Sequence, residues 1–362
     1  MKSIIRLMLG VLLLGVFASC ENESVNPYTD KTPLWPAYQS GVNKYGYINK
    51  EGEFVIPAQF DQASSFSCGY AIVGLNGKNY YINTKGELQQ SATFDDMSDF
   101  YYGRALVLVG NNTGMINTKF EFAIQPVYYD LGVMSEEGVT YFRRSSSDKN
   151  YGLIDKDGKE LTQMMFESAP EFDGGIACVT QGTKVGAIDR KGKFVILPTY
   201  NYLHNLGRGR VRFYESGRYG MLDANGNQIL SPMYAFIDEF WDDMAPFSMT
   251  GDKYGYIGLD GKEKLPAIYD DASPFFGGYA FVESNYHYMI IDKAGQMLYT
   301  LPDGWYPTVS VCHNGLFLVQ KDSEFNTEYR YIKPDGTYVY GWTGINLDMI
   351  KVKQRKDKYV LK

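Results

Sequence analysis

The sequence predicts an all-β protein, a tandem array of about nine β-hairpin-type repeats of ~34 residues. Two observations carry this prediction: a recurring motif, first seen as KYGYIN at Lys44–Asn49, and its near-constant spacing of 34, 34, 38, 34, 34, 35, 34 and 41 residues. A third is that short apolar segments alternate with turn residues, with no sustained helical period. The central residues of the nine copies are Ile48, Ile82, Ile116, Ile154, Ile188, Leu222, Ile257, Ile291 and Ile332.

The first element of each repeat is a strand that ends in a tight turn. In the first copy, aromatic and apolar residues alternate through Tyr45-Gly46-Tyr47-Ile48, and Asn49 is followed three residues later by Gly52. An Asn or Asp side chain caps the start of such a turn, and glycine accepts the positive φ that closes it. The pattern therefore predicts a hairpin in each unit, although Phe120 replaces the turn glycine in the third.

Two further strands complete the predicted unit. A short apolar strand such as Phe54–Ile56 ends near Pro57, because proline cannot donate to a β-ladder. A third strand follows in an F-x-x-G-x-A-x-V segment, for example Phe66 to Val73, and a short polar turn leads into the next copy. A four-residue insertion within Arg143–Asn150 predicts one lengthened hairpin tip.

The repeat resembles the WG-containing (KWG) repeat family of bacterial proteins, with Tyr in place of the family's Trp. Lys44–Val73 (KYGYINKEGEFVIPAQFDQASSFSCGYAIV) and Lys253–Val282 (KYGYIGLDGKEKLPAIYDDASPFFGGYAFV) carry the resemblance best. The resemblance implies a binding or structural role rather than catalysis. We therefore expect a non-catalytic protein whose array is a protein-binding or scaffolding surface.

Two architectures suit β-units of this length: an open β-solenoid or superhelix, and a closed β-propeller. Nine units exceed the usual 4–8 blades of a propeller. The two ends also carry the same elements, because Trp35–Val42 and Ile350–Lys353 both read as third strands. Ring closure usually uses complementary fragments that complete one blade, so the sequence favours the open array, with the propeller as the alternative.

The N-terminal residues predict export and lipid anchoring. Residues 1–19 read as a signal peptide, with basic Lys2 and Arg6 before an eleven-residue apolar run, Leu7–Phe17. The Ala18-Ser19-Cys20 ending resembles a bacterial lipobox, which implies a lipidated Cys20 and anchoring to the outer membrane of a cell envelope. An ordinary secretory signal cleaved near Ser19 is the alternative.

The segment after the cysteine predicts a tether. Residues 20–32 are polar and acidic, as in a flexible linker, and are similar to the surface-export signal of Bacteroidetes lipoproteins. The repeat array then spans residues 33–362. Membrane contact is expected through the lipid anchor only, on either side of the outer membrane.

Composition and motifs argue against several functions. A net charge of −7 makes nucleic acid a poor partner. The three histidines fall at unrelated repeat positions, so we expect no metal, no cofactor and no enzyme activity. Asp61, Asp95 and Asp270 recur at one repeat position, which indicates a turn rather than the paired carboxylates of a glycosidase.

The candidate ligand-binding residues are tyrosines that recur three positions before the central aliphatic residue. A solvent-facing row of them could stack on sugar rings or on side chains of a protein ligand. A carbohydrate- or cell-wall-binding module is therefore the alternative to protein binding, and packing of the tyrosines between units is the alternative to both. The candidates are Tyr45, Tyr151, Tyr219, Tyr254, Tyr288 and Tyr329.

Overall fold

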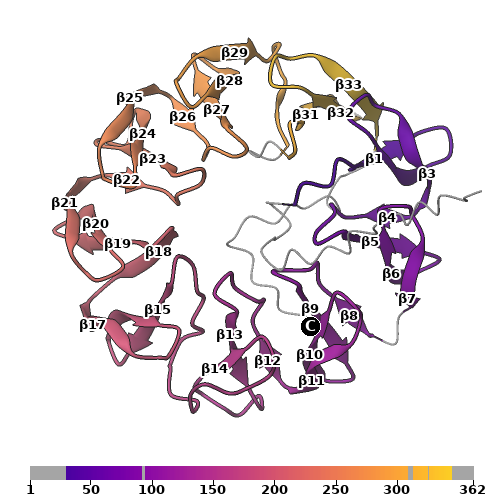
Figure 1. The fold of residues 1–362 in the computed structure, drawn as a ribbon. Helices are drawn as coiled ribbons and strands as arrows, with labels where there is room; N and C mark the ends of the chain where they lie inside the picture. Colours follow the sequence, from indigo (N-terminus) through magenta and orange to yellow (C-terminus); the bar gives the residue numbers. More distant parts are fainter. Residues whose placement is uncertain (1–29, 92–93, 309–312, 325, 345–362) are drawn as a thin grey trace, which may run out of the picture.

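The computed structural model describes residues 30–344, apart from 92–93, 309–312 and 325, as antiparallel sheets arranged in a ring (Figure 1). Within these residues there are nine sheets, which confirms the predicted all-β array of about nine units. The predicted signal peptide, Cys20, the tether up to residue 29 and residues 345–362 lie outside the described part. No helix in the described part is long and apolar enough to cross a membrane.

Six sheets, the blades of the ring, have four strands in chain order from the centre to the rim (Figure 1). Blade 2 consists of β4 (Gln62–Ala63), β5 (Tyr70–Leu75), β6 (Lys78–Asn83) and β7 (Leu88–Ser91). Blade 3 consists of β8 (Asp96–Met97), β9 (Arg104–Val109), β10 (Asn112–Asn117) and β11 (Phe122–Tyr128). Blade 6 consists of β18 (Leu203–Gly207), β19 (Arg210–Glu215), β20 (Arg218–Asp223) and β21 (Gln228–Tyr234).

The other four-stranded blades lie toward the C-terminal end of the array. Blade 7 consists of β22 (Phe236–Ile237), β23 (Met244–Ser248), β24 (Tyr254–Gly258) and β25 (Glu263–Tyr269). Blade 8 consists of β26 (Asp271–Ala272), β27 (Tyr279–Ser284), β28 (His287–Asp292) and β29 (Met297–Thr300). Blade 9 consists of β30 (Tyr306–Pro307), β31 (Phe317–Asp322), β32 (Thr327–Ile332) and β33 (Tyr338–Thr343).

Three blades have three strands among the described residues. Blade 1 lacks the innermost strand and consists of β1 (Trp35–Gln39), β2 (Lys44–Ile48) and β3 (Phe54–Phe60). Blade 4 lacks the outer strand and consists of β12 (Asp130–Leu131), β13 (Val139–Arg143) and β14 (Gly152–Asp155). Blade 5 again lacks the innermost strand and consists of β15 (Ile176–Gln181), β16 (Lys184–Asp189) and β17 (Phe194–Tyr200).

A blade is offset from the sequence unit by one strand. The F-x-x-G-x-A-x-V strand of one unit pairs with the KYG-type strand of the next, as β5 pairs with β6. Each sequence unit therefore spans two blades, so that its second half already belongs to the neighbouring sheet. This sharing covalently links every pair of consecutive blades.

The glycine of the KYG-type motif is required by close packing inside the blade. The register between β2 and β3 shifts on both sides of Tyr47, so β3 bulges over Gly46. A Cβ at Gly46 would lie 2.5 Å from the carbonyl oxygen of Ile56, which is closer than any side chain tolerates. The same shift recurs in blades 3, 5, 6 and 7, so this glycine fixes the shape of the outer strand.

The predicted turn is present and also forms the contact between blades. Asn49 Oδ1 accepts hydrogen bonds from the backbone N–H groups of Glu51 (3.0 Å) and Glu53 (2.9 Å), and Gly52 has a φ of 85°. In blade 2 the equivalent glycine, Gly86, packs on the blade 1 outer strand, where a Cβ would lie 2.7 Å from Ile56 Cγ2. The turn of each blade thus rests on the preceding blade.

Polar side chains add a second link between blades. The Nε of Arg104, at the start of β9, donates to the carbonyl oxygen of Lys156 in the turn of blade 4 (2.9 Å). Arg210 Nε donates in the same way to Leu259 in blade 7 (2.9 Å). Because both arginines bond to a turn carbonyl of the next blade, they hold neighbouring blades at a fixed spacing.

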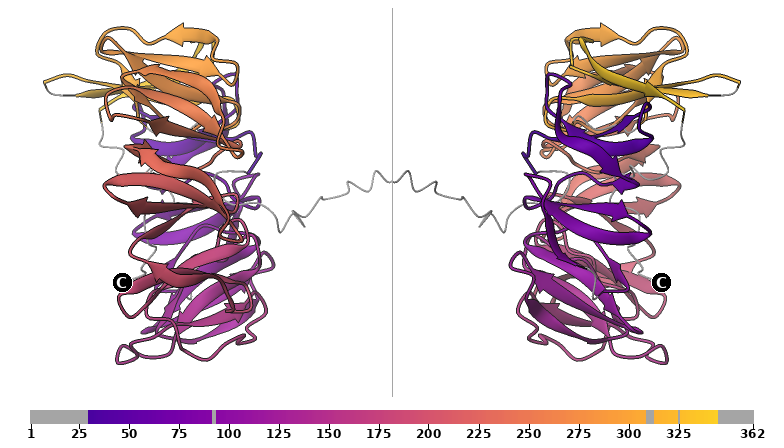
Figure 2. Two further views of the ribbon diagram at one scale, coloured as in Figure 1. Left: turned by 90° about the vertical axis from the view of Figure 1, so that its left-hand side faces the viewer. Right: turned by 90° about the vertical axis from the view of Figure 1, so that its right-hand side faces the viewer.

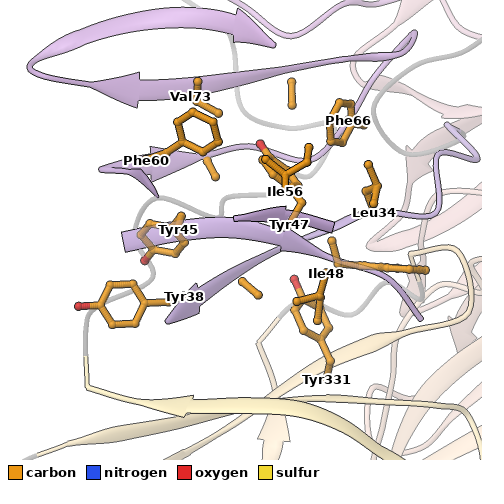
Figure 3. Close-up of a cluster of buried hydrophobic side chains, with 14 of the residues drawn as sticks. Leu34, Tyr38, Tyr45, Tyr47, Ile48, Ile56, Phe60, Phe66, Val73 and Tyr331 are labelled. Carbon is orange, nitrogen blue, oxygen red and sulfur yellow. The ribbon is translucent and has the colours of Figure 1, made fainter. Parts of the chain in front are cut away.

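The open array was the wrong choice, because blade 1 packs directly against blade 9 and closes the ring into a nine-bladed β-propeller. Residues of blade 1 share one buried cluster with Leu316, Leu318, Tyr331 and Trp342 of the C-terminal end (Figure 3). The Tyr331 hydroxyl donates to the carbonyl oxygen of Pro36 at 2.9 Å, across 295 residues of sequence.

Closure follows the same geometry as every other boundary. A Cβ at Gly52 would overlap the carbonyl oxygen of Val339 in β33, as a Cβ at Gly86 would overlap Ile56. Among the described residues, no strand of one terminus enters the blade of the other. The similarity of the two ends therefore does not oppose closure, because the blades need only pack side by side.

The closure predicts that Gly52→Ala destabilises the ring by more than a glycine substitution outside the seam. Ala at position 52 carries both the cost of a left-handed backbone and a clash with Val339. The clash alone is expected to cost about 1–3 kcal/mol. The measurement is the free energy of unfolding from denaturant titration.

Gly77→Ala is the matched control, because Gly77 has a φ of 74° but no atom within 4 Å of the added methyl group. It isolates the backbone cost, about 1–2 kcal/mol. Equal destabilisation by the two substitutions would contradict the packing of blade 1 on blade 9.

Candidate functional site

The propeller has two faces with different loops (Figure 2). We call one the turn face, because it carries the Asx turns between third and outer strands, together with the loops that precede the second strands. We call the other the hairpin face, because it carries the hairpins between second and third strands. The predicted tyrosines stand at or near the start of the third strands and therefore lie at the hairpin face.

Two of the six predicted tyrosines are buried in the seam between blades 1 and 9. Tyr45 is 5% exposed and Tyr329 is 3% exposed. The ring of Tyr45 lies 5.1 Å from that of Tyr38, and Tyr329 stacks on Trp342 at 5.5 Å (Figure 3 shows Tyr38 and Tyr45). Burial disfavours the phenolate and raises the pKa of Tyr45 to about 12.

Two more of the predicted tyrosines lie under arginine side chains. The Cζ of Arg143 lies 5.1 Å from the ring centre of Tyr151, and that of Arg212 lies 4.6 Å from the ring centre of Tyr219. These separations are within the range of cation–π attraction. The arginines therefore occupy a ring face that a sugar would need.

The remaining two tyrosines are half-buried. Tyr254 meets Phe236 edge-to-face at 5.6 Å. Tyr288 packs beside a core cluster, and burial raises the pKa of its phenol. Each of the six tyrosines thus packs against other side chains of the chain. Sugar binding stays a prediction, and these tyrosines do not supply it with a row of exposed rings.

The recurring carboxylates close the hairpins, as their common repeat position predicted. Asp61, Asp95 and Asp270 each accept a hydrogen bond from a backbone N–H in the next hairpin, at 3.0, 2.7 and 2.8 Å. Lys44 bonds to Asp61, and Lys253 bonds to Asp270, which holds the pKa of both carboxyl groups below the usual range. In the part of the chain that the structure describes, no three His, Cys, Asp or Glu residues form a group that could hold a metal ion.

Sequence reasoning missed a cavity of about 560 Å³ on the turn face, where blades 3, 4 and 5 meet. Its lining includes Tyr102 of blade 3, the Ser135–Val139 loop and Asp155–Asp157 turn of blade 4, and Arg190 and Lys191 in the turn of blade 5. Cavities of this size hold small organic ligands. The only sequence signal was that Leu161–Phe166 departs from the usual outer-strand pattern.

Sequence reasoning also missed three apolar side chains exposed on the hairpin face of consecutive blades. Tyr214 of blade 6 is 45% exposed, Met249 of blade 7 is 38% exposed and Tyr286 of blade 8 is 94% exposed. All three lie in or beside the hairpins between second and third strands. These positions vary from unit to unit, so the repeat pattern does not reveal them.

The chain belongs to the WG containing repeat family. Seven segments that together cover more than half of the chain match the family profile: residues 45–78, 81–112, 114–143, 151–184, 186–218, 219–254 and 254–288. The predicted resemblance is thereby confirmed for the repeats. No curated protein matches the chain.

Solved structures support the ring-shaped fold. The chain is similar to dipeptidyl peptidase 4 from Porphyromonas gingivalis, with a TM-score of 0.53 and 8% identity, over 89% of this chain and 59% of that one. It also matches BamB from Moraxella catarrhalis, with a TM-score of 0.36 and 12% identity, over 68% and 84% of the two chains. At these identities, the likeness to the peptidase concerns the fold alone.

Proposed function

We propose that this protein is a non-catalytic binding scaffold whose hairpin face binds another protein. The observation that carries the proposal is the row of exposed hairpin residues Tyr214, Met249 and Tyr286 on three consecutive blades. Tyrosine and methionine are enriched in protein–protein interfaces, whereas soluble proteins seldom leave such side chains exposed together without a use. Membership of the WG containing repeat family is compatible with a binding role.

Tyr286 stands where the fold prefers glycine. The hairpin of blade 8 has φ angles of 51° at Asn285 and 65° at Tyr286, as a two-residue turn of this type requires. The same hairpin in blade 2 uses Asn76 and Gly77, with φ angles of 53° and 74°. A left-handed backbone costs a residue other than glycine about 1–2 kcal/mol. Backbone strain of this kind gathers at functional sites, which supports a binding role for the exposed ring.

The proposal includes export and a lipid anchor on Cys20 at the outer membrane. The first described residue, Asp30, accepts hydrogen bonds from the backbone N–H of Thr32 (2.7 Å) and of Gly69 (3.4 Å) in a turn-face loop. Ten residues of chain reach at most about 36 Å from Cys20 to this point. An anchored propeller would therefore direct its turn face toward the membrane and its hairpin face toward a partner.

Removing the exposed apolar residues of the hairpin face should abolish partner binding. The variant Tyr214→Ala, Met249→Ala, Tyr286→Ala is compared with the wild-type protein in capture from the native envelope, followed by affinity measurement with the purified partner. Because the interface is spread over three blades, Tyr286→Ala alone should weaken binding by about tenfold, equivalent to about 1.4 kcal/mol. Equal binding by the triple variant and the wild-type protein would contradict the proposal.

Tyr286→Gly separates binding from folding. Glycine accepts the left-handed backbone, so the free energy of unfolding should rise by up to about 1 kcal/mol while partner affinity falls. Gly77→Ala, at the matching hairpin position of blade 2, is the control that leaves the exposed row unchanged. A glycine variant that gains stability and keeps full affinity would exclude Tyr286 from the interface.

Cys20→Ser tests the anchor. The variant should move from the membrane fraction to the soluble fraction after cell lysis, because the acyl chains supply the membrane affinity. The control is Cys68→Ser, since Cys68 is buried in the propeller and plays no part in attachment. Retention of the Cys20→Ser protein in the membrane fraction would contradict a lipid anchor at this residue.

A further inference from the structure

The turn-face cavity lies where the regular blade pattern is broken. Blade 4 lacks its outer strand and blade 5 lacks its innermost strand among the described residues. The connecting segment between β14 and β15 makes only isolated bridges, such as the one between Tyr151 and Phe166. The chain therefore leaves a cavity of about 560 Å³ beside this boundary, lined by three blades.

Several charged groups of the cavity wall already serve the fold. Asp155 Oδ1 accepts hydrogen bonds from the backbone N–H groups of Asp157 (3.0 Å) and Lys159 (2.8 Å), as the Asx turn requires. The Asp157 side chain forms an ion pair with the buried Arg104 at 3.3 Å. These groups hold blade 4 against blade 3, and their charges are already neutralised or hydrogen-bonded.

The blade 5 side of the cavity carries two cations without a partner. Arg190 and Lys191 line the cavity from the turn of blade 5, and both are exposed. Their side chains form no hydrogen bond or ion pair with any residue that the structure describes. A ligand anion at this wall would therefore gain charge-assisted hydrogen bonds without displacing a protein group.

The blade 4 side carries the opposite charge. Glu136 is exposed at the wall, and its carboxylate has no partner among the described residues. Glu137 Oε1 accepts a hydrogen bond from the backbone N–H of Gly175 at 2.6 Å, whereas its Oε2 is shielded from solvent and has no hydrogen-bond partner. No protein donor offsets this buried oxygen, so the blade 4 wall favours a cation in the cavity.

We propose that this cavity binds a small zwitterion, with its ammonium group toward Glu136 and Glu137 and its carboxylate toward Arg190 and Lys191. The free main chain of an amino acid or a short peptide has this charge pattern. Tyr102, Val139 and Leu161 also line the cavity and give apolar surface for a side chain. The site lies on the face opposite the proposed protein-binding row, so the two proposals stand or fall separately.

The test is calorimetric titration of the whole purified protein with a set of Ala-Xaa dipeptides. At least one dipeptide should bind, and its N-acetylated and C-amidated forms should each bind at least tenfold more weakly, because each lacks one charge. Absence of binding by every dipeptide at about 10 mM would overturn the proposal. So would binding that is unchanged by both blocking groups.

Variants assign the two walls. Arg190→Ala with Lys191→Ala, and separately Glu136→Gln with Glu137→Gln, should each weaken dipeptide binding at least tenfold. Glutamine at 137 keeps an oxygen acceptor for the N–H of Gly175, and the two cations lie on an exposed turn, so both variants should fold. Lys50→Ala, at the turn position in blade 1 that Arg190 occupies in blade 5, is the matched control and should bind normally. Unchanged binding by both double variants would place the dipeptide elsewhere and overturn the site.

Discussion

The structure depends on one recurring contact, the packing of each Asx turn against the outer strand of the preceding blade. The turn glycine makes the contact possible, because any side chain there would meet the neighbouring strand, as at Gly86 and Ile56. The contact at Gly52 and Val339 is the same one, made between the first and last blades. A ring closed in this way needs no shared blade, since the seam uses the packing that already joins every other pair.

The local structure could be predicted from the sequence, whereas the ring could not. The turn at Asn49–Gly52 and the strands around it follow from residue type and spacing within a few positions. Closure depends on the small rotation between blades added over the whole array, and no single motif encodes that rotation. The decisive contacts, such as Tyr331 with Pro36, join residues that are far apart in the sequence.

The candidate sites show the same division between local pattern and three-dimensional packing. The tyrosines recur in sequence, but the environment of each depends on a non-repeating neighbour, such as Arg143 above Tyr151 or Trp342 against Tyr329. The cavity arises because strands are missing from two consecutive blades, and its charges come from turn positions that vary freely. Features that differ between units are therefore the ones that remain available for binding, while the repeated residues maintain the propeller.

The most direct test of the account is the distance between blades 1 and 9 in solution. Spin labels would be placed at the exposed rim residues Val55 and Tyr338, with Leu88 and Phe122 of the adjacent blades 2 and 3 as the reference pair. Electron–electron resonance should give a similar short distance for both pairs, because each pair lies on neighbouring blades. A distance for Val55 and Tyr338 far longer than for the reference pair would show an open array and would contradict the closed ring.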